Sequence, residues 1–239
     1  MSTRVFELVG PPGAGKSTIA RTLVERSGGG VVYLRLREWR NLPAVARSVV
    51  RVALPFLFHL PSLERRRWNK FSELVQAHSY YDVVSARLGP GAPGVLLDQG
   101  PVYLLSILQR TLASDPAENS RLFLRHWDAL LTRWARRLDF IVLLEASDDA
   151  LYGRITSRGN RHPVVGTTRE EATRFLENAR RSRDRIVARL QEKNPHLEVL
   201  RINTEEAPLG EIVEQLLGRV GQQRAPAAGE SRRSAAGRT

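Results

Sequence analysis

The sequence predicts a three-layer α/β fold in which one parallel β-sheet carries helices on both faces. Short apolar runs alternate with longer segments of helical periodicity along most of the 239 residues. Such alternation is typical of parallel sheets whose strands are joined by helical crossovers. The apolar fraction of 42% also supplies enough hydrophobic side chains for a core of this size.

The N-terminal part alternates strand and helix at close spacing. Residues 5–9 form a short apolar run that predicts the first strand, and a helical pattern over 16–26 follows a glycine-rich turn. The glycines at 28–30 end this helix, since glycine adopts left-handed backbone angles without a steric penalty. Residues 31–36 predict the second strand, and 42–87 have a helical pattern broken by prolines.

The C-terminal part continues the alternation. Strands are predicted at 95–98, 140–144 and 197–202, and the run at 140–144 is apolar throughout, as in strands buried on both faces. Helices are predicted at 102–113, 119–137, 147–158, 169–191 and 209–220. From residue 221 the composition turns to Gln, Ala, Gly, Ser and Arg, which predicts disorder. We therefore expect one domain over 1–220 and a disordered tail over 221–239.

The net charge of +12 at pH 7 raises the question of a nucleic-acid partner. Of the 37 basic residues three are lysine, so 37 − 3 leaves 34 arginines, a bias typical of a G+C-rich coding sequence. Many of these arginines alternate with acidic residues on predicted helical faces. The charge therefore does not by itself predict nucleic-acid binding.

Three features concern the cellular location. The chain has no cysteine, so it has neither disulfides nor thiolate metal sites. Its first residues lack the apolar core of a signal peptide. The longest apolar stretch, 49–60, contains Arg51, Pro55 and His59 and is shorter than the ~20 residues of a membrane span. These features predict a cytoplasmic location without a membrane span.

The turn between the first strand and the first helix matches the pattern G-x-x-x-x-G-K-[ST], followed by Thr18. Its residues are Gly10, Pro11, Pro12, Gly13, Ala14, Gly15, Lys16 and Ser17. In such a P-loop the glycines let backbone N–H groups turn inward onto phosphate oxygens, and the helix N-terminus adds positive partial charge. We expect Lys16 to reach the β- and γ-phosphates and the Ser17 hydroxyl to help hold Mg²⁺. The motif therefore predicts ATP and Mg²⁺ as cofactors.

Asp98 is the last residue of the third predicted strand. In open α/β sheets ligands bind at the carboxyl ends of the strands, so we expect Asp98 in the same crevice as the P-loop. A carboxylate there would bind Mg²⁺ or accept a proton from the phosphate acceptor. The alternative is an N-cap for the helix that follows. We favour the functional role.

Arg154 and Arg158 lie four residues apart on one face of a predicted helix, so both guanidiniums can reach one phosphate group. The polar segment after them is bounded by Gly159 and Gly166, as a mobile lid would be. Cations that close over a transferring phosphoryl group neutralise developing charge and exclude water. We expect a lid at about 153–168. A solvated arginine face is the alternative.

The order and spacing of these motifs resemble those of the nucleoside-monophosphate kinase group of P-loop kinases, and within it the thymidylate kinase and deoxynucleoside kinase families. The matching segments beyond the P-loop are 98–103, 154–159 and 200–206. The resemblance implies a five-stranded parallel sheet in the order 2-3-1-4-5. It also implies that Asn203 and Glu205 border the adenine and that Arg154 contacts the nucleotide.

Two positions bear on the acceptor. These families usually have an arginine that grips a phosphate where this chain has Gln99, which weakens the case for a nucleotide acceptor. Deoxynucleoside kinases carry a glutamate as general base after the second strand, commonly near a tryptophan, and Glu38 and Trp39 lie at the matching place. A plain surface segment is the alternative there. Either Asp98 or Glu38 is the candidate base.

We therefore expect an ATP-dependent phosphotransferase with a small-molecule acceptor, and a hydroxyl acceptor such as a nucleoside, sugar or antibiotic is favoured. Three alternatives stay open: a nucleoside-monophosphate kinase such as a thymidylate kinase-like enzyme, a polynucleotide 5′-kinase, and a nucleotide-dependent regulatory ATPase. No apolar run ends in the Asp-Glu pair of ATPases that activate water, which disfavours the last. Nucleic acid is disfavoured as a partner, and a homodimer is left open.

Overall fold

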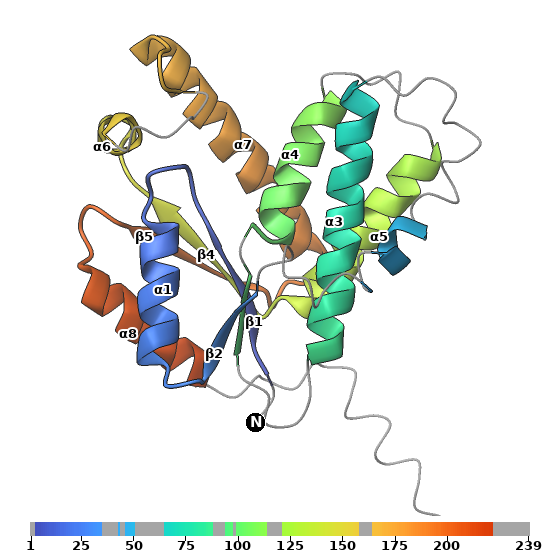
Figure 1. Cartoon of the computed structure of the whole chain (residues 1–239), viewed down its shortest axis with the longest axis horizontal. Helices are drawn as coiled ribbons and strands as arrows, with labels where there is room; N and C mark the ends of the chain where they lie inside the picture. Colours follow the sequence, from blue (N-terminus) through green and yellow to red (C-terminus); the bar gives the residue numbers. More distant parts are fainter. Residues whose placement is uncertain are drawn as a thin grey trace, which may run out of the picture.

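The computed structural model centres on a five-stranded parallel sheet with the order β2-β3-β1-β4-β5 (Figure 1). The residues that the structure describes are 3–34, 43, 46–50, 65–87, 94–97, 99–113, 121–157 and 164–221. The strands are β1 (Val5–Val9), β2 (Val31–Leu34), β3 (Gly94–Leu97), β4 (Phe140–Glu145) and β5 (Glu198–Asn203). The predicted fold class and strand order are confirmed.

Helices cover both faces of the sheet. They are α1 (Lys16–Arg26), α3 (Arg65–Arg87), α4 (Pro101–Ala113), α5 (Arg121–Arg137), α6 (Asp148–Thr156), α7 (Arg169–Lys193) and α8 (Leu209–Gly221). Helices α1 and α8 bury one face, while α3, α4, α5 and α7 bury the other (Figure 1). None of the described helices is long and apolar enough to cross a membrane.

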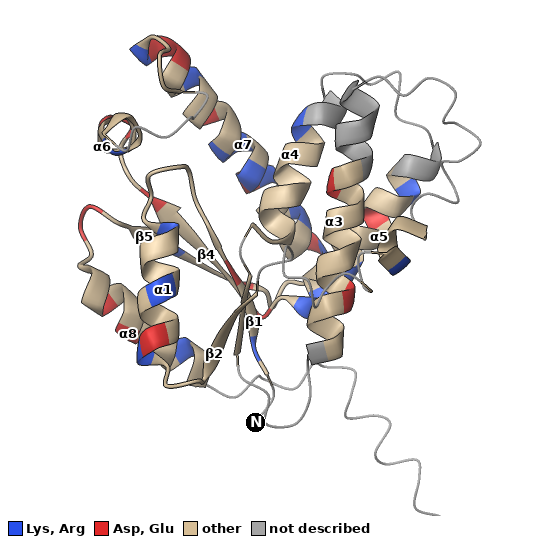
Figure 2. Ribbon diagram, viewed as in Figure 1, with Lys and Arg blue, Asp and Glu red and all other residues tan. Residues whose placement is uncertain are grey.

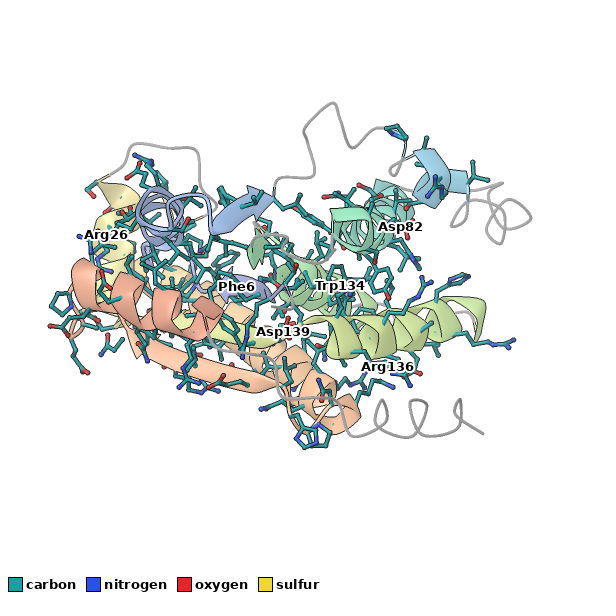
Figure 3. The ribbon with its side chains drawn as sticks, turned by 90° about the horizontal axis from the view of Figure 1, so that it is seen from below. Phe6, Arg26, Asp82, Trp134, Arg136 and Asp139 are labelled. Atoms are coloured by element: carbon teal, nitrogen blue, oxygen red, sulfur yellow. The ribbon has the colours of Figure 1, made fainter. Side chains whose placement is uncertain are left out.

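A hydrophobic core lies on each face of the sheet. Alternate residues of β1 pack into one core or the other, because successive side chains of a strand point to opposite faces. Val5 and Val9 pack under α3, α4, α5 and α7, whereas Phe6 and Leu8 pack under α1 and α8. Phe6 stacks on Phe140 of the neighbouring strand at a centroid distance of 4.5 Å. Figure 3 shows Phe6 inside the molecule, in the core between the sheet and α1 and α8.

Trp134 of α5 is fully buried in the core between the sheet and α3, α4, α5 and α7 (Figure 3). Its indole N–H donates to the carbonyl oxygen of Ala77 at 3.3 Å and so ties α5 to α3. Just after α5, the Asp139 carboxylate accepts a hydrogen bond from the backbone N–H of Val5 at 2.7 Å. These two contacts fix α5 against its neighbouring helix and against the start of the central strand.

Helix α6 is shorter than predicted. The sequence pattern predicts a helix over 147–158, but α6 begins at Asp148, with Ser147 as its N-cap, and ends at Thr156, with Ser157 as its C-cap. Arg158 lies outside the described residues. The predicted pairing of Arg154 with Arg158 on one helical face therefore stays a prediction.

The carboxyl ends of the strands meet at one edge of the sheet. There β1 leads into the P-loop, β3 into the turn before α4, β4 into α6, and β5 into residues 204–206. Since all five strands are parallel, these four connections lie at the same edge, where open α/β sheets bind ligands.

Glu7, the central residue of β1, is fully buried. Its carboxylate accepts hydrogen bonds from the backbone N–H groups of Val102 at 2.8 Å and Tyr103 at 3.0 Å, both in the first turn of α4. These N–H groups have no partner inside the helix, and the positive end of the helix offsets the buried charge. Glu7 therefore attaches α4 to the strand that leads into the P-loop. No local sequence pattern indicates this role.

Gly100, directly before α4, approaches Glu7 closely. A Cβ atom at Gly100 would lie 2.8 Å from Cβ of Leu97 and 2.9 Å from Cδ of Glu7. We expect Gly100→Ala to lower the free energy of unfolding by about 1–3 kcal/mol, because overpacking forces the surrounding atoms to shift. Urea unfolding of the purified protein measures this.

The matched control is Gly153→Ala in α6, where a Cβ would meet nothing within 4 Å. Alanine is favoured over glycine in a helix by about 0.5–1 kcal/mol, so this variant should be as stable as the wild type or more stable. A similar loss in both variants would contradict the crowding at Gly100.

Candidate nucleotide and acceptor site

The predicted P-loop connects β1 to α1 at the carboxyl edge of the sheet. Gly13 and Gly15 have φ angles of 84° and 82°, a left-handed conformation that glycine adopts without strain. The N–H of Ala14 donates to the carbonyl oxygen of Pro11 at 3.2 Å and closes the turn. Gly15 is the N-cap of α1, and none of the described side chains caps this end. The first-turn N–H groups of α1 are therefore suited to an anion.

Lys16 lies across the loop. Its Nζ donates to the carbonyl oxygens of Gly10 and Pro11, at 2.8 Å each. The ammonium group is thus held beside the N-terminus of α1, where it can exchange these carbonyl oxygens for phosphate oxygens. The predicted reach of Lys16 to the β- and γ-phosphates stays a prediction.

Ser17 and Thr18 lie in the first turn of α1 with exposed side chains. A serine hydroxyl is a hard oxygen ligand, and Mg²⁺ usually takes one or two protein ligands completed by phosphate oxygens and water. Ser17 therefore fits a magnesium ion. No cluster of three or more His, Asp or Glu residues that would hold a metal on its own occurs among the described residues. The second predicted ligand, Asp98, lies outside them.

Arg154 of α6 connects three segments of the site. Its Nη1 donates to Oγ1 of Thr204, after β5, at 3.1 Å and to the carbonyl oxygen of Gly13 in the P-loop at 3.4 Å. The guanidinium group therefore contacts the P-loop. Its predicted contact with the nucleotide stays a prediction.

Glu205 and Asn203 organise the loop after β5. The Glu205 carboxylate accepts hydrogen bonds from the backbone N–H and the hydroxyl of Ser147, the N-cap of α6, and these bonds lower its pKa. The Asn203 carboxamide oxygen accepts from the Glu205 N–H at 3.1 Å, and its Nδ2 donates to Oε1 of Glu206 at 2.7 Å. Glu205 thus holds the loop to α6, while Asn203 holds the loop together internally. Their predicted contact with adenine stays a prediction.

A cavity of about 290 Å³ adjoins the P-loop, between α4 and α7. We call it the P-loop cavity. It is mostly apolar, with an aromatic residue from each helix, Tyr103 and Phe175. Its described lining is Val9, Gly10, Pro11, Pro12, Tyr103, Ser106, Ile107, Arg110, Phe175, Ala179, Arg180 and Arg183.

Two of the three arginines in the P-loop cavity are already neutralised. Arg180 forms an ion pair with Asp148 and donates to the carbonyl oxygen of Ala146 at 3.1 Å. Arg183, whose side chain is 6% exposed, pairs with Asp184 at 3.0 Å and with Glu145 at 3.6 Å. Arg110 forms no ion pair within the described part of the chain. Of the three arginines it is the one without a carboxylate at ion-pair distance in the described structure, although its charge interacts with Glu73.

Of the five predicted catalytic residues, Lys16 and Arg154 both contact the backbone of the P-loop. Glu38, Asp98 and Arg158 lie outside the described residues. Glu7 and the arginines of the P-loop cavity were not predicted. The density of arginines over 180–185 was an available signal for two of them, but it is only part of the arginine bias of the whole chain, which is typical of a G+C-rich coding sequence.

Burial perturbs the pKa of Glu73 in α3 strongly. Burial raises its pKa to about 7, and the positive charge of Arg110 acts in the opposite direction. Its Oε2 is buried without a hydrogen-bond partner in the described structure. Glu73 of α3 and Arg110 of α4 thus interact electrostatically, and Arg110 lines the P-loop cavity.

This raised pKa predicts a pH-dependent stability. Between its ordinary value of 4.5 and about 7 the folded chain keeps a proton that the unfolded chain releases, so this group makes stability fall as the pH rises through that window. We expect Glu73→Gln to remove that fall. Urea unfolding at pH values from about 5 to 8 compares the two proteins.

Glu177→Gln, the same change at an exposed position of α7, is the control and should keep the wild-type pH profile. If Glu73→Gln also keeps that profile, the carboxyl group of Glu73 is not the source of the pH dependence.

Comparison with known proteins identifies relatives, although no family model matches the sequence. An adenylate kinase of Novosphingobium aromaticivorans is 30% identical over 151 residues, which cover 63% of this chain and 57% of the relative. An adenylate kinase of Paracoccus denitrificans is 30% identical over 175 residues, 68% of this chain and 64% of the relative. The match thus spans less than two thirds of the length of either relative.

A solved structure supports the fold independently of sequence. Deoxyadenosine kinase from M. mycoides with bound dATP superimposes with a TM-score of 0.54 at 10% sequence identity, over 92% of this chain and 100% of that one. The sheet order, the P-loop at the end of β1 and these similarities agree. The chain is related to the P-loop nucleoside and nucleotide kinases.

Proposed function

We propose that the chain transfers the γ-phosphate of ATP to a small molecule bound in the P-loop cavity. The observation that carries this proposal is that one loop, the P-loop, borders both the cavity and the predicted nucleotide site. Gly10, Pro11 and Pro12 line the cavity, and Lys16 crosses the same loop from the side of α1. The phosphates of ATP and the acceptor would therefore lie close together at the P-loop. Such proximity, with water excluded, is what phosphate transfer to the acceptor requires.

The reaction joins an acceptor oxygen to the γ-phosphorus while the bond from that phosphorus to the β,γ-bridging oxygen breaks. Lys16 and Arg154 would offset the charge on the phosphoryl oxygens, together with Arg158. A bound Mg²⁺, held by Ser17 and Asp98, would neutralise the phosphates further. A hydroxyl acceptor also loses a proton, and we propose Asp98 or Glu38 as the group that accepts it.

A hydroxyl acceptor, such as a nucleoside, sugar or antibiotic, is the class we favour. A phosphate acceptor needs several unpaired cations to offset repulsion between the two phosphates. In the P-loop cavity Arg180 and Arg183 are committed to carboxylates of the protein, and Gln99 stands where related families have a phosphate-binding arginine. The remaining lining is mostly apolar, which suits an uncharged acceptor.

A nucleoside monophosphate is the second candidate. Both curated relatives are named adenylate kinase, and Arg110 supplies one cation for an acceptor phosphate. A thymidylate kinase-like activity belongs to this candidate. A polynucleotide fits less well, because a cavity of about 290 Å³ suits a small molecule. The presence of this cavity beside the P-loop also favours transfer over a regulatory ATPase.

Three further expectations belong to the same proposal. The kinase domain would span 1–220 with a lid at about 153–168, and 221–239 would form a tail. The enzyme would act in the cytoplasm, where ATP is available. A homodimer stays open.

The test is ATP turnover against a panel of nucleosides, their monophosphates, sugars and aminoglycosides, with the product identified by ³¹P NMR. We expect a phosphomonoester as the product. Lys16→Ala should lower kcat/KM by about 10²–10³, the usual cost of losing one charge-stabilising group. Arg21→Ala removes an exposed cation from the same helix and should stay within about twofold of the wild type.

A diphosphate product would favour the nucleoside-monophosphate candidate. Full activity of Lys16→Ala, or no transfer to any acceptor, would contradict the proposed phosphotransfer.

A further inference from the structure

A second cavity, of about 310 Å³, lies between α4 and α7. We call it the arginine cavity. Among the described residues it shares Arg110 alone with the P-loop cavity, and it contains no residue of the P-loop. Its described lining is Gln109, Arg110, Asn178, Arg181, Ser182 and Arg185.

Helices α4 and α7 are held together between the two cavities. Ser182 is buried and donates its hydroxyl to the backbone oxygen of Ser106, at 2.9 Å. Ser106 lines the P-loop cavity, whereas Ser182 lines the arginine cavity. The two cavities are therefore neighbours that are separated by a packed contact, with Arg110 common to both.

The arginine cavity has an unbalanced positive charge. Three guanidinium groups line it, and none of its described lining residues is acidic. The nearest carboxylate along α7, Asp184, pairs with Arg183 and Arg201 instead. Within the described part of the chain, Arg110, Arg181 and Arg185 form no ion pair, although Glu73 of α3 interacts electrostatically with Arg110. Figure 2 shows the basic segments in the middle of α7, where this helix passes α4. Like charges gathered in this way favour an anion between them.

Gln109 adds a hydrogen-bond donor to the arginine cavity. Its side chain lines the cavity between the arginines of α4 and α7. Phosphate oxygens accept hydrogen bonds, so the part of Gln109 that can bind a phosphate is its NH₂ group, not the amide oxygen, which is buried without a partner in the described structure.

We propose that the arginine cavity binds a phosphate group and that Arg110 couples this site to the P-loop cavity. Arginine presents a planar set of donors that matches phosphate oxygens in pairs. Arg181 and Arg185 lie four residues apart on one face of α7, so both reach one ligand, and Arg110 approaches from α4. Phosphate binding itself does not depend on the proposed phosphotransfer, whereas the coupling does.

The phosphate has two potential sources with the same chemistry. It is either a phosphate of the acceptor remote from the accepting hydroxyl, or a separate phosphorylated molecule that acts as an effector. In both cases the ligand draws Arg110 toward the arginine cavity and changes the charge that faces the P-loop cavity.

The first experiment is a titration of the full chain with inorganic phosphate, followed by ³¹P NMR, with the P-loop filled by a non-hydrolysable ATP analogue and Mg²⁺. We expect saturable binding of one phosphate. Arg181→Gln and Arg185→Gln should each weaken it at least about tenfold, because each removes a charged hydrogen-bond donor. Gln109→Leu should weaken binding without lowering the temperature of thermal unfolding.

Arg189→Gln is the matched control, since Arg189 is an exposed arginine one turn further along α7 and does not line the cavity. It should keep phosphate affinity within about twofold. No saturable binding, or an equal loss in Arg185→Gln and Arg189→Gln, would overturn the proposal, because the charge would then act diffusely.

The second experiment separates the two sources by steady-state kinetics. If the acceptor supplies the phosphate, an acceptor with a remote phosphate has a lower KM than its dephosphorylated form, and Arg185→Gln removes that advantage. If an effector supplies it, added phosphate changes the KM of the dephosphorylated acceptor, again only with Arg185 present. Phosphate binding with no effect on any KM would overturn the coupling through Arg110. Absence of turnover with phosphate still bound would reject the phosphotransfer alone.

Discussion

The attachment of α4 to the central strand by the buried Glu7 carboxylate is the interaction on which the site depends most. A fully buried carboxylate is costly unless hydrogen bonds and positive charge surround it. Glu7 receives both from the first turn of α4, at Val102 and Tyr103. Because Glu7 is two residues before the end of β1, this contact places α4, one wall of the P-loop cavity, directly beside the P-loop.

The other side of the site is held by polar contacts among loops at the same edge of the sheet. Glu205 after β5 binds the N-cap of α6 through Ser147, and Arg154 of α6 binds Thr204 and the P-loop. Arg180 of α7 pairs with Asp148 at the start of α6. Helix α4 is therefore fixed to β1, and helix α7 is fixed to α6. Both walls of the P-loop cavity are thus positioned beside the P-loop.

The sequence was informative where a function needs a short local pattern. The P-loop, Lys16 and Arg154 were predicted because their spacing reflects the geometry of a turn and of one helix face, and the strand order followed from a family resemblance. Glu7 could not be predicted in this way, since its partners lie about 95 residues later in the chain and it sits within an apolar run. The role of Arg110 likewise depends on the crossing of α4 and α7, which no local pattern encodes. Glu38, Asp98 and Arg158 stay predictions.

Amide hydrogen exchange at Val102 and Tyr103 tests the role of Glu7 most directly, in the wild type and in Glu7→Gln. Glutamine has nearly the same shape, but its NH₂ group cannot accept a hydrogen bond, so one of the two N–H groups loses its partner. We predict that both amides are protected in the wild type and that exchange at one or both becomes at least about tenfold faster in Glu7→Gln, while amides of α8 are unchanged. Unprotected amides in the wild type, or equal exchange in the two proteins, would contradict the account.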